Sequence, residues 1–251
     1  MRRIISPVKT VCFVTLLVSL PFLINGRTTR SVTSRLVLAA PSSASLSSSA
    51  SAVAEATMLN DSLHLDTKGL NIKALEYALK GFNYLQQKGI LYNKDILSIC
   101  DFSQSSKNKR LYVIDIENKK LMLNTYVAHG KNSGSEYANS FSNNPNSLKS
   151  SLGFYVTRST YFGGHGLSLK IDGLEKGFND KANTRNIVVH GSDYVGDNFV
   201  RSNNFCGRSY GCPAVPSQES LMVINTIKNG SCLFIYHPTQ KYLKQSRILN
   251  S

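Results

Sequence analysis

Hydrophobic positions recur every three or four residues between Asn71 and Lys88, which is the period of an α-helix with one buried face. The apolar side chains that form this face are Ile72, Leu75, Ala78, Leu79, Phe82 and Leu85. Lys88 ends the periodic stretch and Gly89 follows it, which is typical of a helix C-terminus. The pattern predicts a helix over residues 71–88 whose aromatic side chains serve for packing.

After Asp101 the pattern changes to that of β-strands. Residues 111–116 and 121–128 are apolar runs on either side of the polar turn 117–120, which predicts a β-hairpin. Further strands are predicted at 153–157, 167–171, 186–190 and 231–236, a helix at 218–228, and loops at 132–151 and 192–208. Because strands and helices do not alternate regularly, we predict a mainly β fold with a few helices, of the α+β class, and no parallel series.

The N-terminus carries an export signal. Basic residues Arg2, Arg3 and Lys9 accompany an uncharged apolar stretch at 10–24, which is short for a membrane span and typical of a secretory signal. No small-x-small cleavage site follows at once, so residues 1–26 are predicted to be either a signal peptide or an uncleaved N-terminal anchor. Residues 27–56 are rich in Ser, Ala, Thr and Arg and are predicted to be a disordered tether.

The remaining chain divides into a helical N-terminal segment at 57–100, a β-rich domain at 101–238 and a tail at 239–251. Export places this domain in the periplasm or cell envelope, where the apolar N-terminal segment is an optional membrane tether. The net charge of +14 favours anionic surroundings such as a cell-wall polymer or a membrane surface. The Lys and Arg residues are scattered and match no nucleic-acid-reading pattern, so no nucleic-acid partner is predicted. We expect a monomer.

A cysteine between glycine and proline, in the segment 207–213, carries the strongest chemical signal. Cys212 follows Gly211, where the chain can turn sharply, and His190 ends an apolar run about two dozen residues upstream. A thiol nucleophile needs a nearby base, and the intermediate that it forms needs hydrogen-bond donors for its oxyanion. We therefore interpret Cys212 as the nucleophile of an acyl-transfer reaction and His190 as its base.

The residues beside this pair are candidates for supporting roles. Ser209 is predicted to steady the turn or the imidazole, and the N–H groups of Tyr210, Gly211 and Cys212 are candidate oxyanion donors. Gly191 and His165 are candidates for the oxyanion or substrate site, with a structural or surface role as the alternative for His165. No histidine shows ligand spacing with a second His or Cys, so neither a metal nor a cofactor is predicted.

An exported chain also admits a plainer interpretation of its cysteines. If the first segment is removed, Cys100, Cys206, Cys212 and Cys232 remain, an even number that two disulfides would use. A Cys206–Cys212 bridge would consume the nucleophile and leave a non-catalytic wall-binding protein. A sortase is a weaker alternative, because the only arginine after Cys212 is Arg247 in the tail.

The motif His190-Gly191 followed by Ser209-Tyr210-Gly211-Cys212 resembles the His-Gly and Ser-His-Gly-Cys signature of the bacterial murein L,D-transpeptidases. The segment 207–215 is similar to a cell-wall branch with the motif Gly-Arg-Ser-x-Gly-Cys-Pro-Ala-Val, and 151–156 is similar to a conserved segment upstream. The likeness covers roughly residues 100–237. Three features depart from the family pattern: Tyr210 replaces a histidine, the spacing between His190 and Cys212 is a little longer than usual, and Ala214 stands where a polar Arg or Asn is usual.

This resemblance implies an L,D-transpeptidase-like β-sandwich or barrel, preceded by a helical segment. It implies that Cys212 attacks a diaminopimelate carbonyl in a peptidoglycan stem peptide, expels D-alanine and leaves a thioester. A second stem amine would then form a 3→3 crosslink, or another amine would exchange the terminal D-alanine. With water as acceptor, the protein would be an L,D-carboxypeptidase. The family also implies that carbapenems acylate Cys212.

Overall fold

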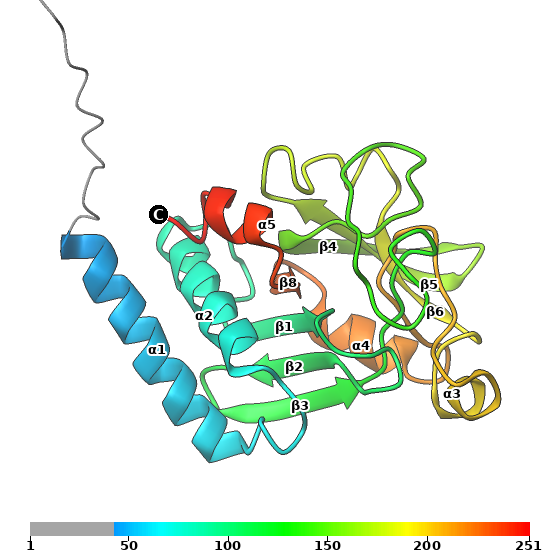
Figure 1. The fold of residues 1–251 in the computed structure, drawn as a ribbon, viewed down its shortest axis with the longest axis horizontal. Coiled ribbons are helices and arrows are strands. Elements are labelled where there is room, and N and C mark those ends of the chain that lie inside the picture. Colours follow the sequence, from blue (N-terminus) through cyan, green and yellow to red (C-terminus); the bar gives the residue numbers. More distant parts are fainter. Residues whose placement is uncertain (1–42) are drawn as a thin grey trace, which may run out of the picture. The chain divides into compact units, whose positions relative to one another are not determined.

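The computed structural model describes residues 43–251, which contain eight strands and five helices (Figure 1). The strands are β1 Ile96–Asp101, β2 Leu111–Asp115, β3 Lys120–Thr125, β4 Gly153–Gly163, β5 Gly166–Gly173, β6 Val188–Ser192, β7 Ala214–Pro216 and β8 Cys232–Tyr236. The helices are α1 Ser43–Leu63, α2 Ile72–Gln87, α3 Asp197–Asn203, α4 Ser220–Ile227 and α5 Gln240–Gln245. The prediction of a mainly β fold with a few helices is confirmed.

All eight strands belong to one barrel-like sheet in the order β3-β2-β1-β8-β4-β5-β6-β7. The two ends of the sheet meet, because Ala128, just after edge strand β3, bridges to Ala214 of edge strand β7. The Ala128 N–H donates to the Ala214 carbonyl at 2.8 Å, and a second bridge joins Gly130 to Ser209. The segment 128–130 therefore lies against the chain on both sides of Cys212.

The predicted hairpin is confirmed, since β2 and β3 pair antiparallel around a turn in which the Asn118 N–H donates to Asp115 Oδ1. Two neighbouring pairs are parallel: β1 with β8 and β6 with β7. The sequence did not indicate these pairs, because the two strands of each pair are far apart in the sequence. In addition, β7 is only three residues long.

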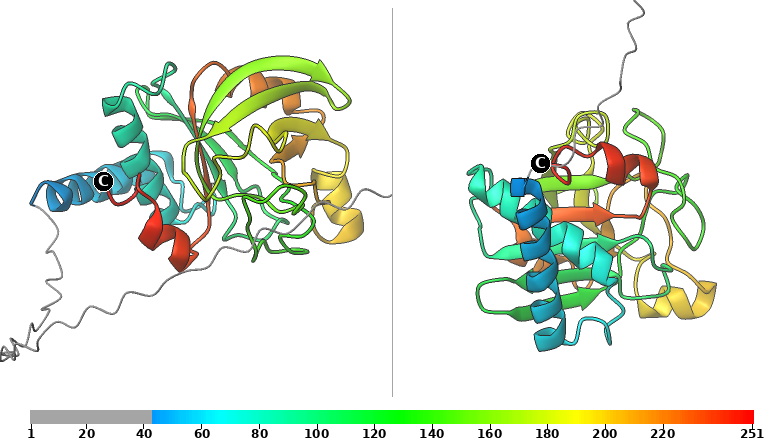
Figure 2. Two further views of the ribbon diagram at one scale, coloured as in Figure 1. Left: turned by 90° about the horizontal axis from the view of Figure 1, so that it is seen from above. Right: turned by 60° about the vertical axis from the view of Figure 1, so that its left-hand side comes forward.

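Helix α2 confirms the helix predicted at 71–88. Asn71 caps its N-terminus, where Asn71 Oδ1 accepts from the Lys73 N–H at 2.8 Å. The apolar face packs on β1 and β8 (Figure 2), and its buried members are Ala74, Leu75, Ala78, Leu79, Gly81, Phe82 and Leu85. This face closes one side of the main hydrophobic core.

Strand β1 corrects the prediction that residues 57–100 are a helical segment. All six residues of β1 are buried, and the strand lies between β2 and β8 near the middle of the sheet. A strand that is buried on both faces shows no alternation of polar and apolar residues, so its period cannot be read from the sequence.

Helix α1 corrects the predicted tether, because residues 43–56 of that segment are helical. Helix α1 lies against α2 (Figure 2), and its side chains Ala52, Ala56 and Leu59 are buried. Two of these three side chains are alanines, which a search for large apolar residues at helical spacing does not detect. Residues 1–42, with the predicted signal peptide or anchor and the rest of the tether, lie outside the described residues. Among the described helices, none is both long and apolar enough to cross a membrane.

Two further segments contain helices that the sequence did not predict. The loop at 192–208 holds α3, and the tail at 239–251 holds α5, where Tyr242 is fully buried. The Tyr242 hydroxyl donates to Glu175 Oε2 at 2.8 Å, and the Ser246 hydroxyl donates to Glu175 Oε1. Burial raises the pKa of Glu175, whereas these two hydroxyl donors lower it and so stabilise the charged carboxylate. The C-terminal tail is therefore held on the domain by hydrogen bonds to Glu175, which lies far from it in the sequence.

Close approach of α2 to β4 gives a test of the packing. A Cβ at Gly81 would lie 2.0 Å from the Phe154 ring, which is itself stacked on Phe234 with ring centroids 4.1 Å apart. We expect Gly81→Ala to destabilise the protein by about 1–2 kcal/mol in urea unfolding, because overpacking outweighs the gain in helix propensity of up to about 1 kcal/mol. Gly164→Ala is the control, since nothing lies within 4 Å of its added Cβ. Equal stability of the Gly81 variant and the parent would contradict this packing.

Candidate active site

Strand β6 and the segment before β7 bring His190 and Cys212 into one neighbourhood. In the parallel pairing of these strands, His190 is the partner of Ala214, which is two residues after Cys212. Strand β6 is held in place by burial of Val188 and Val189 and by its antiparallel pairing with β5. The structure thus brings together the two residues that the sequence singled out.

The Cys212 sulfur lies against the backbone that leads into His190. Cys212 Sγ accepts a hydrogen bond from the Val188 N–H at 3.5 Å and lies 3.7 Å from the Asn186 carbonyl oxygen. The thiol is free, and so are Cys100, Cys206 and Cys232. The alternative of a Cys206–Cys212 disulfide is therefore wrong for this structure.

His190 is held in one orientation by the backbone. Its Nδ1 lies 2.9 Å from the Gly191 carbonyl oxygen, which can only accept, so Nδ1 carries the hydrogen and Nε2 is the basic nitrogen. Burial lowers the pKa of His190, the bond to Gly191 raises it, and the neighbouring His165 lowers it. The imidazole is consequently neutral at pH 7.

Gly191 and His165 both touch this imidazole. The Cα of Gly191 packs closely against helix α4, because an added Cβ would lie 2.8 Å from Ser220 Oγ. Gly191 therefore orients the histidine with its carbonyl, whereas the sequence had suggested an oxyanion or substrate role. His165, in the turn between β4 and β5, stacks on His190 with ring centroids 4.2 Å apart and an interplanar angle of 22°.

Ser209 shapes the turn that presents Cys212. Its hydroxyl donates to the Cys212 carbonyl at 2.6 Å and accepts from the Gly211 N–H at 3.0 Å. Two roles were predicted for Ser209, and these hydrogen bonds support the one in which it steadies the turn. Gly211 adopts φ +127°, and an added Cβ would lie 2.8 Å from the Lys149 carbonyl oxygen, so both the conformation and the space require glycine.

The turn determines which N–H groups can bind an oxyanion. The Gly211 N–H already donates to Ser209, which removes it from the three predicted donors. The N–H groups of Tyr210 and Cys212 have no acceptor within residues 43–251. The Tyr210 side chain is 71% exposed and lies under Lys131, whose Nζ is 5.7 Å from the ring centroid.

Arg185 is a site residue that sequence reasoning missed. Its guanidinium donates to the carbonyls of Ser142 and Lys149 at 2.8 and 2.7 Å and to the Ser151 hydroxyl. Burial raises the pKa of Cys212, while the Val188 N–H and the positive charge of Arg185 lower it. Arg185 lies three residues before β6, the strand that carries His190, but no motif distinguishes it from the other basic residues of the chain.

A second missed arginine supports the turn from inside the core. Arg110 is fully buried and donates to the Val127 carbonyl and, at 2.7 Å, to His129 Nδ1. Burial and the Arg110 charge lower the pKa of His129 to about 3, so this histidine stays neutral and accepts the bond. The His129 carbonyl in turn accepts from the Ser209 N–H at 3.0 Å. His129 thus links the buried Arg110 to the turn.

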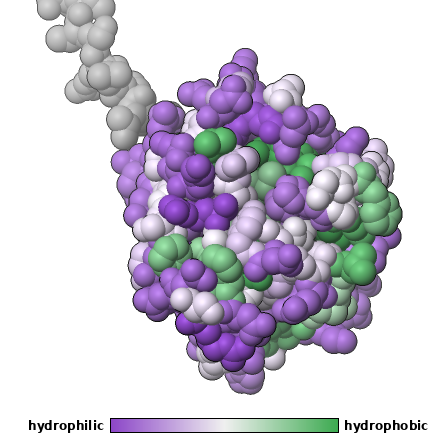
Figure 3. All heavy atoms as spheres, turned by 90° about the vertical axis from the view of Figure 1, so that its right-hand side faces the viewer, coloured by the Kyte–Doolittle hydropathy of each residue, from purple (hydrophilic) through white to green (hydrophobic). Residues whose placement is uncertain are grey.

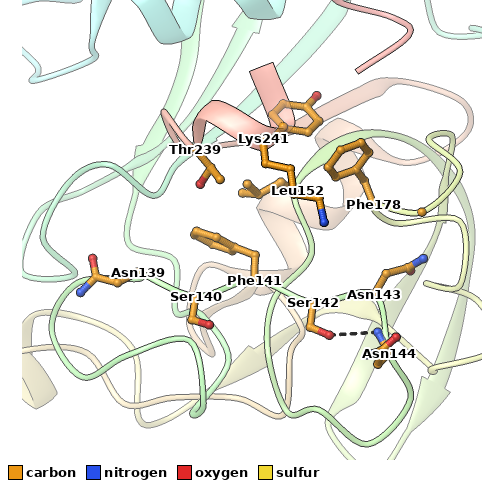
Figure 4. A pocket seen from close by; sticks show the side chains of 12 residues that line it. Asn139, Ser140, Phe141, Ser142, Asn143, Asn144, Leu152, Phe178, Thr239 and Lys241 are labelled. Atoms are coloured by element: carbon orange, nitrogen blue, oxygen red, sulfur yellow. Dashed lines mark hydrogen bonds between the residues drawn. The ribbon is translucent and has the colours of Figure 1, made fainter. Parts of the chain in front are cut away.

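Other candidate sites lie apart from this chemistry. No group of three or more His, Cys, Asp or Glu residues in the described part of the chain could hold a metal ion. A separate pocket of about 430 Å³ is lined by the Asn- and Ser-rich loop 139–144, Leu152, Phe178 and residues of α5 (Figure 4). Its lining includes neither Cys212 nor His190.

The family model described as L,D-transpeptidase catalytic domain matches residues 66–236, more than half of the chain. No curated protein matches the chain significantly.

Several solved structures are also similar. An L,D-transpeptidase from Mycobacterium smegmatis is 10% identical with a TM-score of 0.36, and the match covers 57% of this chain and 59% of that one. The L,D-transpeptidase LdtMt1 in complex with imipenem is also 10% identical, with a TM-score of 0.35 and the same coverage. L,D-transpeptidase 1 of Mycobacterium tuberculosis is 11% identical with a TM-score of 0.31, and the match covers 57% of this chain and 62% of that one. The chain thus spans about three fifths of these proteins' lengths.

The opposing influences on the thiol give a test. Removing the positive charge in Arg185→Met is expected to raise the pKa of Cys212 further, because the thiolate loses a stabilising charge. The pH midpoint of iodoacetamide labelling at Cys212, followed by peptide mass spectrometry, should then shift to higher pH.

Two variants control for lost loop contacts. Arg185→Lys keeps the charge and should shift the midpoint less, and Arg158→Met removes an ion pair with Asp172 without touching the site. A midpoint in Arg185→Met that equals or lies below that of the parent would contradict the electrostatic role.

Proposed function

Because the chain belongs to the L,D-transpeptidase catalytic domain family, we propose that it is a transpeptidase that acts on peptidoglycan stem peptides through a thioester on Cys212. The observation that carries this proposal is the seating of Cys212 Sγ on the Val188 N–H, at the start of the strand that presents His190. A thiol, an oriented imidazole and two unpaired N–H groups are the parts that acyl transfer requires.

The resting pair is proposed to be a neutral thiol with a neutral imidazole. Burial raises the pKa of Cys212 and lowers that of His190, so both shifts oppose a thiolate–imidazolium pair. Proton transfer from Sγ to His190 Nε2 therefore accompanies the attack, as in general-base catalysis. The Gly191 carbonyl keeps Nδ1 protonated and Nε2 free for this transfer.

The two half-reactions then follow from this pair. Sγ bonds to the carbonyl carbon of diaminopimelate, and the N–H groups of Tyr210 and Cys212 bind the oxyanion. The C–N bond to D-alanine breaks, the leaving amine takes the proton from His190, and a thioester remains. A side-chain amine of a second stem attacks the thioester, His190 accepts its proton, and the sulfur leaves to restore the thiol. A 3→3 crosslink is the product, and water in place of the amine gives the carboxypeptidase reaction.

The family and the sequence together support an extracytoplasmic location. L,D-transpeptidases act on the cell wall, and the N-terminal apolar segment is proposed to export the protein or anchor it in the membrane. We propose that it acts as a monomer without a metal or cofactor.

The nucleophile is tested by substitution. In Cys212→Ala, D-alanine release from a tetrapeptide stem should fall by at least about a thousandfold, because no other group can form the acyl-enzyme. Intact mass spectrometry should also detect no carbapenem adduct. Cys206→Ala, which removes a buried thiol of the neighbouring loop, should keep both activities. An adduct on the Cys212 variant would place the nucleophile elsewhere.

The base is tested by pH dependence. Because the pKa of His190 is lowered, kcat/KM should remain high below the usual histidine range and fall only as the pH drops through the lowered pKa. His190→Asn should reduce acylation by about 10²- to 10⁴-fold and abolish this acid limb. If the acid limb persists unchanged in the variant, another group is the base.

A further inference from the structure

A cavity of about 530 Å³ adjoins the segment that carries Cys212. Its lining residues are Lys131, Tyr194, Phe199, Asn203, Phe205, Gly207, Arg208 and Tyr210. Two are cationic, four are aromatic and none is acidic. We propose that this cavity binds a carboxylate of the stem peptide, with Lys131 and Arg208 as the binding groups, an inference that rests on the proposed function.

The cavity is continuous with the turn that presents the nucleophile. Arg208 and Tyr210 flank Ser209, whose hydroxyl bonds to the Cys212 carbonyl. Lys131 is fixed to the same turn, because its N–H donates to the Ser209 carbonyl at 2.7 Å. A ligand in the cavity is thus held by residues whose backbone positions are coupled to that of the sulfur.

The two cations of the cavity lack an anionic partner. The ion pairs within residues 43–251 are Lys73–Glu76, Lys107–Glu136 and Arg158–Asp172, none of which includes Lys131 or Arg208. Arg208 donates through Nη1 to the Gly134 carbonyl at 3.3 Å, which leaves further guanidinium N–H groups for a ligand. A planar carboxylate matches such a fork, and the Lys131 ammonium adds a second charge.

Aromatic side chains also line the cavity. Tyr194 packs so closely on the chain that a Cβ at Gly207 would lie 2.5 Å from Tyr194 Cβ, and Phe199 and Phe205 add apolar surface from α3 and the chain after it. These aromatic residues offer apolar surface to the stem beside Lys131 and Arg208, which are themselves exposed and accessible to a ligand. The side of the molecule that carries α3 shows hydrophobic and hydrophilic side chains next to one another (Figure 3).

The substrate class supplies the complementary charge. A tetrapeptide stem carries carboxylates on its glutamate, on its diaminopimelate and on its terminal D-alanine. All three have the same chemistry, and amidating each in turn distinguishes them. Neutralising the correct one removes the charge but keeps the shape of the stem.

The experiment measures stem binding separately from turnover. Calorimetric titration of the full-length Cys212→Ala protein with a tetrapeptide stem gives a Kd that does not depend on chemistry. Amidation of one of the three carboxylates should raise this Kd about tenfold. Adding Lys131→Met and Arg208→Gln should raise the Kd of the unmodified stem by a similar or larger factor and make binding indifferent to that amidation.

A matched variant and a second readout separate the possible failures. Lys109 also lies over a tyrosine, Tyr126, with Nζ 5.8 Å from the ring centroid, and Lys109→Met should leave the Kd unchanged. Equal Kd values for all stems, or a preference that survives in the double variant, would overturn the inference. D-alanine release by the protein with Cys212 intact tests the proposed function separately. If release is retained but the Kd does not depend on amidation of the stem, the inference about the cavity fails and the proposed function stands. When Lys131→Met and Arg208→Gln are made in the protein that retains Cys212, neutral iodoacetamide should label Cys212 at the parental rate, which reports an intact site.

Discussion

The meeting of the two sheet edges is the constraint on which the site depends. The chain that leaves β3 bridges to β7 at Ala128 and to the catalytic turn at Gly130. Ser150 completes this joint, because its hydroxyl accepts from the Gly130 N–H at 3.0 Å and donates to the Gly211 carbonyl at 3.2 Å. Buried backbone groups that are paired in this way cannot shift singly without leaving a polar group unsatisfied. The position of Cys212 is therefore a property of the whole sheet.

The electrostatics of the site follow from its burial. A partly buried thiol and a buried imidazole both resist charge, and only the Val188 N–H and Arg185 favour the thiolate. Arg185 also donates to the carbonyls of Ser142 and Lys149. The loop that contains these two residues therefore helps to hold the charge that lowers the pKa of Cys212. The neutral resting pair that we propose would also protect the thiol, since thiolates are the form that oxidises most readily.

Local signals predicted much of this architecture. The helix at 71–88 has an amphipathic period and a C-terminal glycine, and the hairpin at 111–128 has a polar turn between two apolar runs. Strand β1 and helix α1 escaped prediction because uniform burial and small side chains leave no period. The pairing of β6 with β7 is a contact between segments far apart in sequence, which composition cannot reveal.

The candidate site shows the same division. Cys212 and His190, which the structure places in neighbouring segments, could be proposed from a motif, because acyl transfer needs a thiol and a base. Arg185 and Arg110 could not, because what distinguishes them is the set of carbonyls they reach in the folded chain. The disulfide alternative likewise needed the fold, since only coordinates tell that Cys206 and Cys212 are separate thiols.

The bond from His190 to the Gly191 carbonyl has an evolutionary consequence. In many hydrolytic enzymes a carboxylate performs this duty, and its loss by mutation is visible in an alignment. In the proposed mechanism the group that orients the histidine is a peptide group, which every amino acid carries. Natural selection can act on this peptide group only through the shape of the main chain, so the side chains in an alignment would not reveal its role.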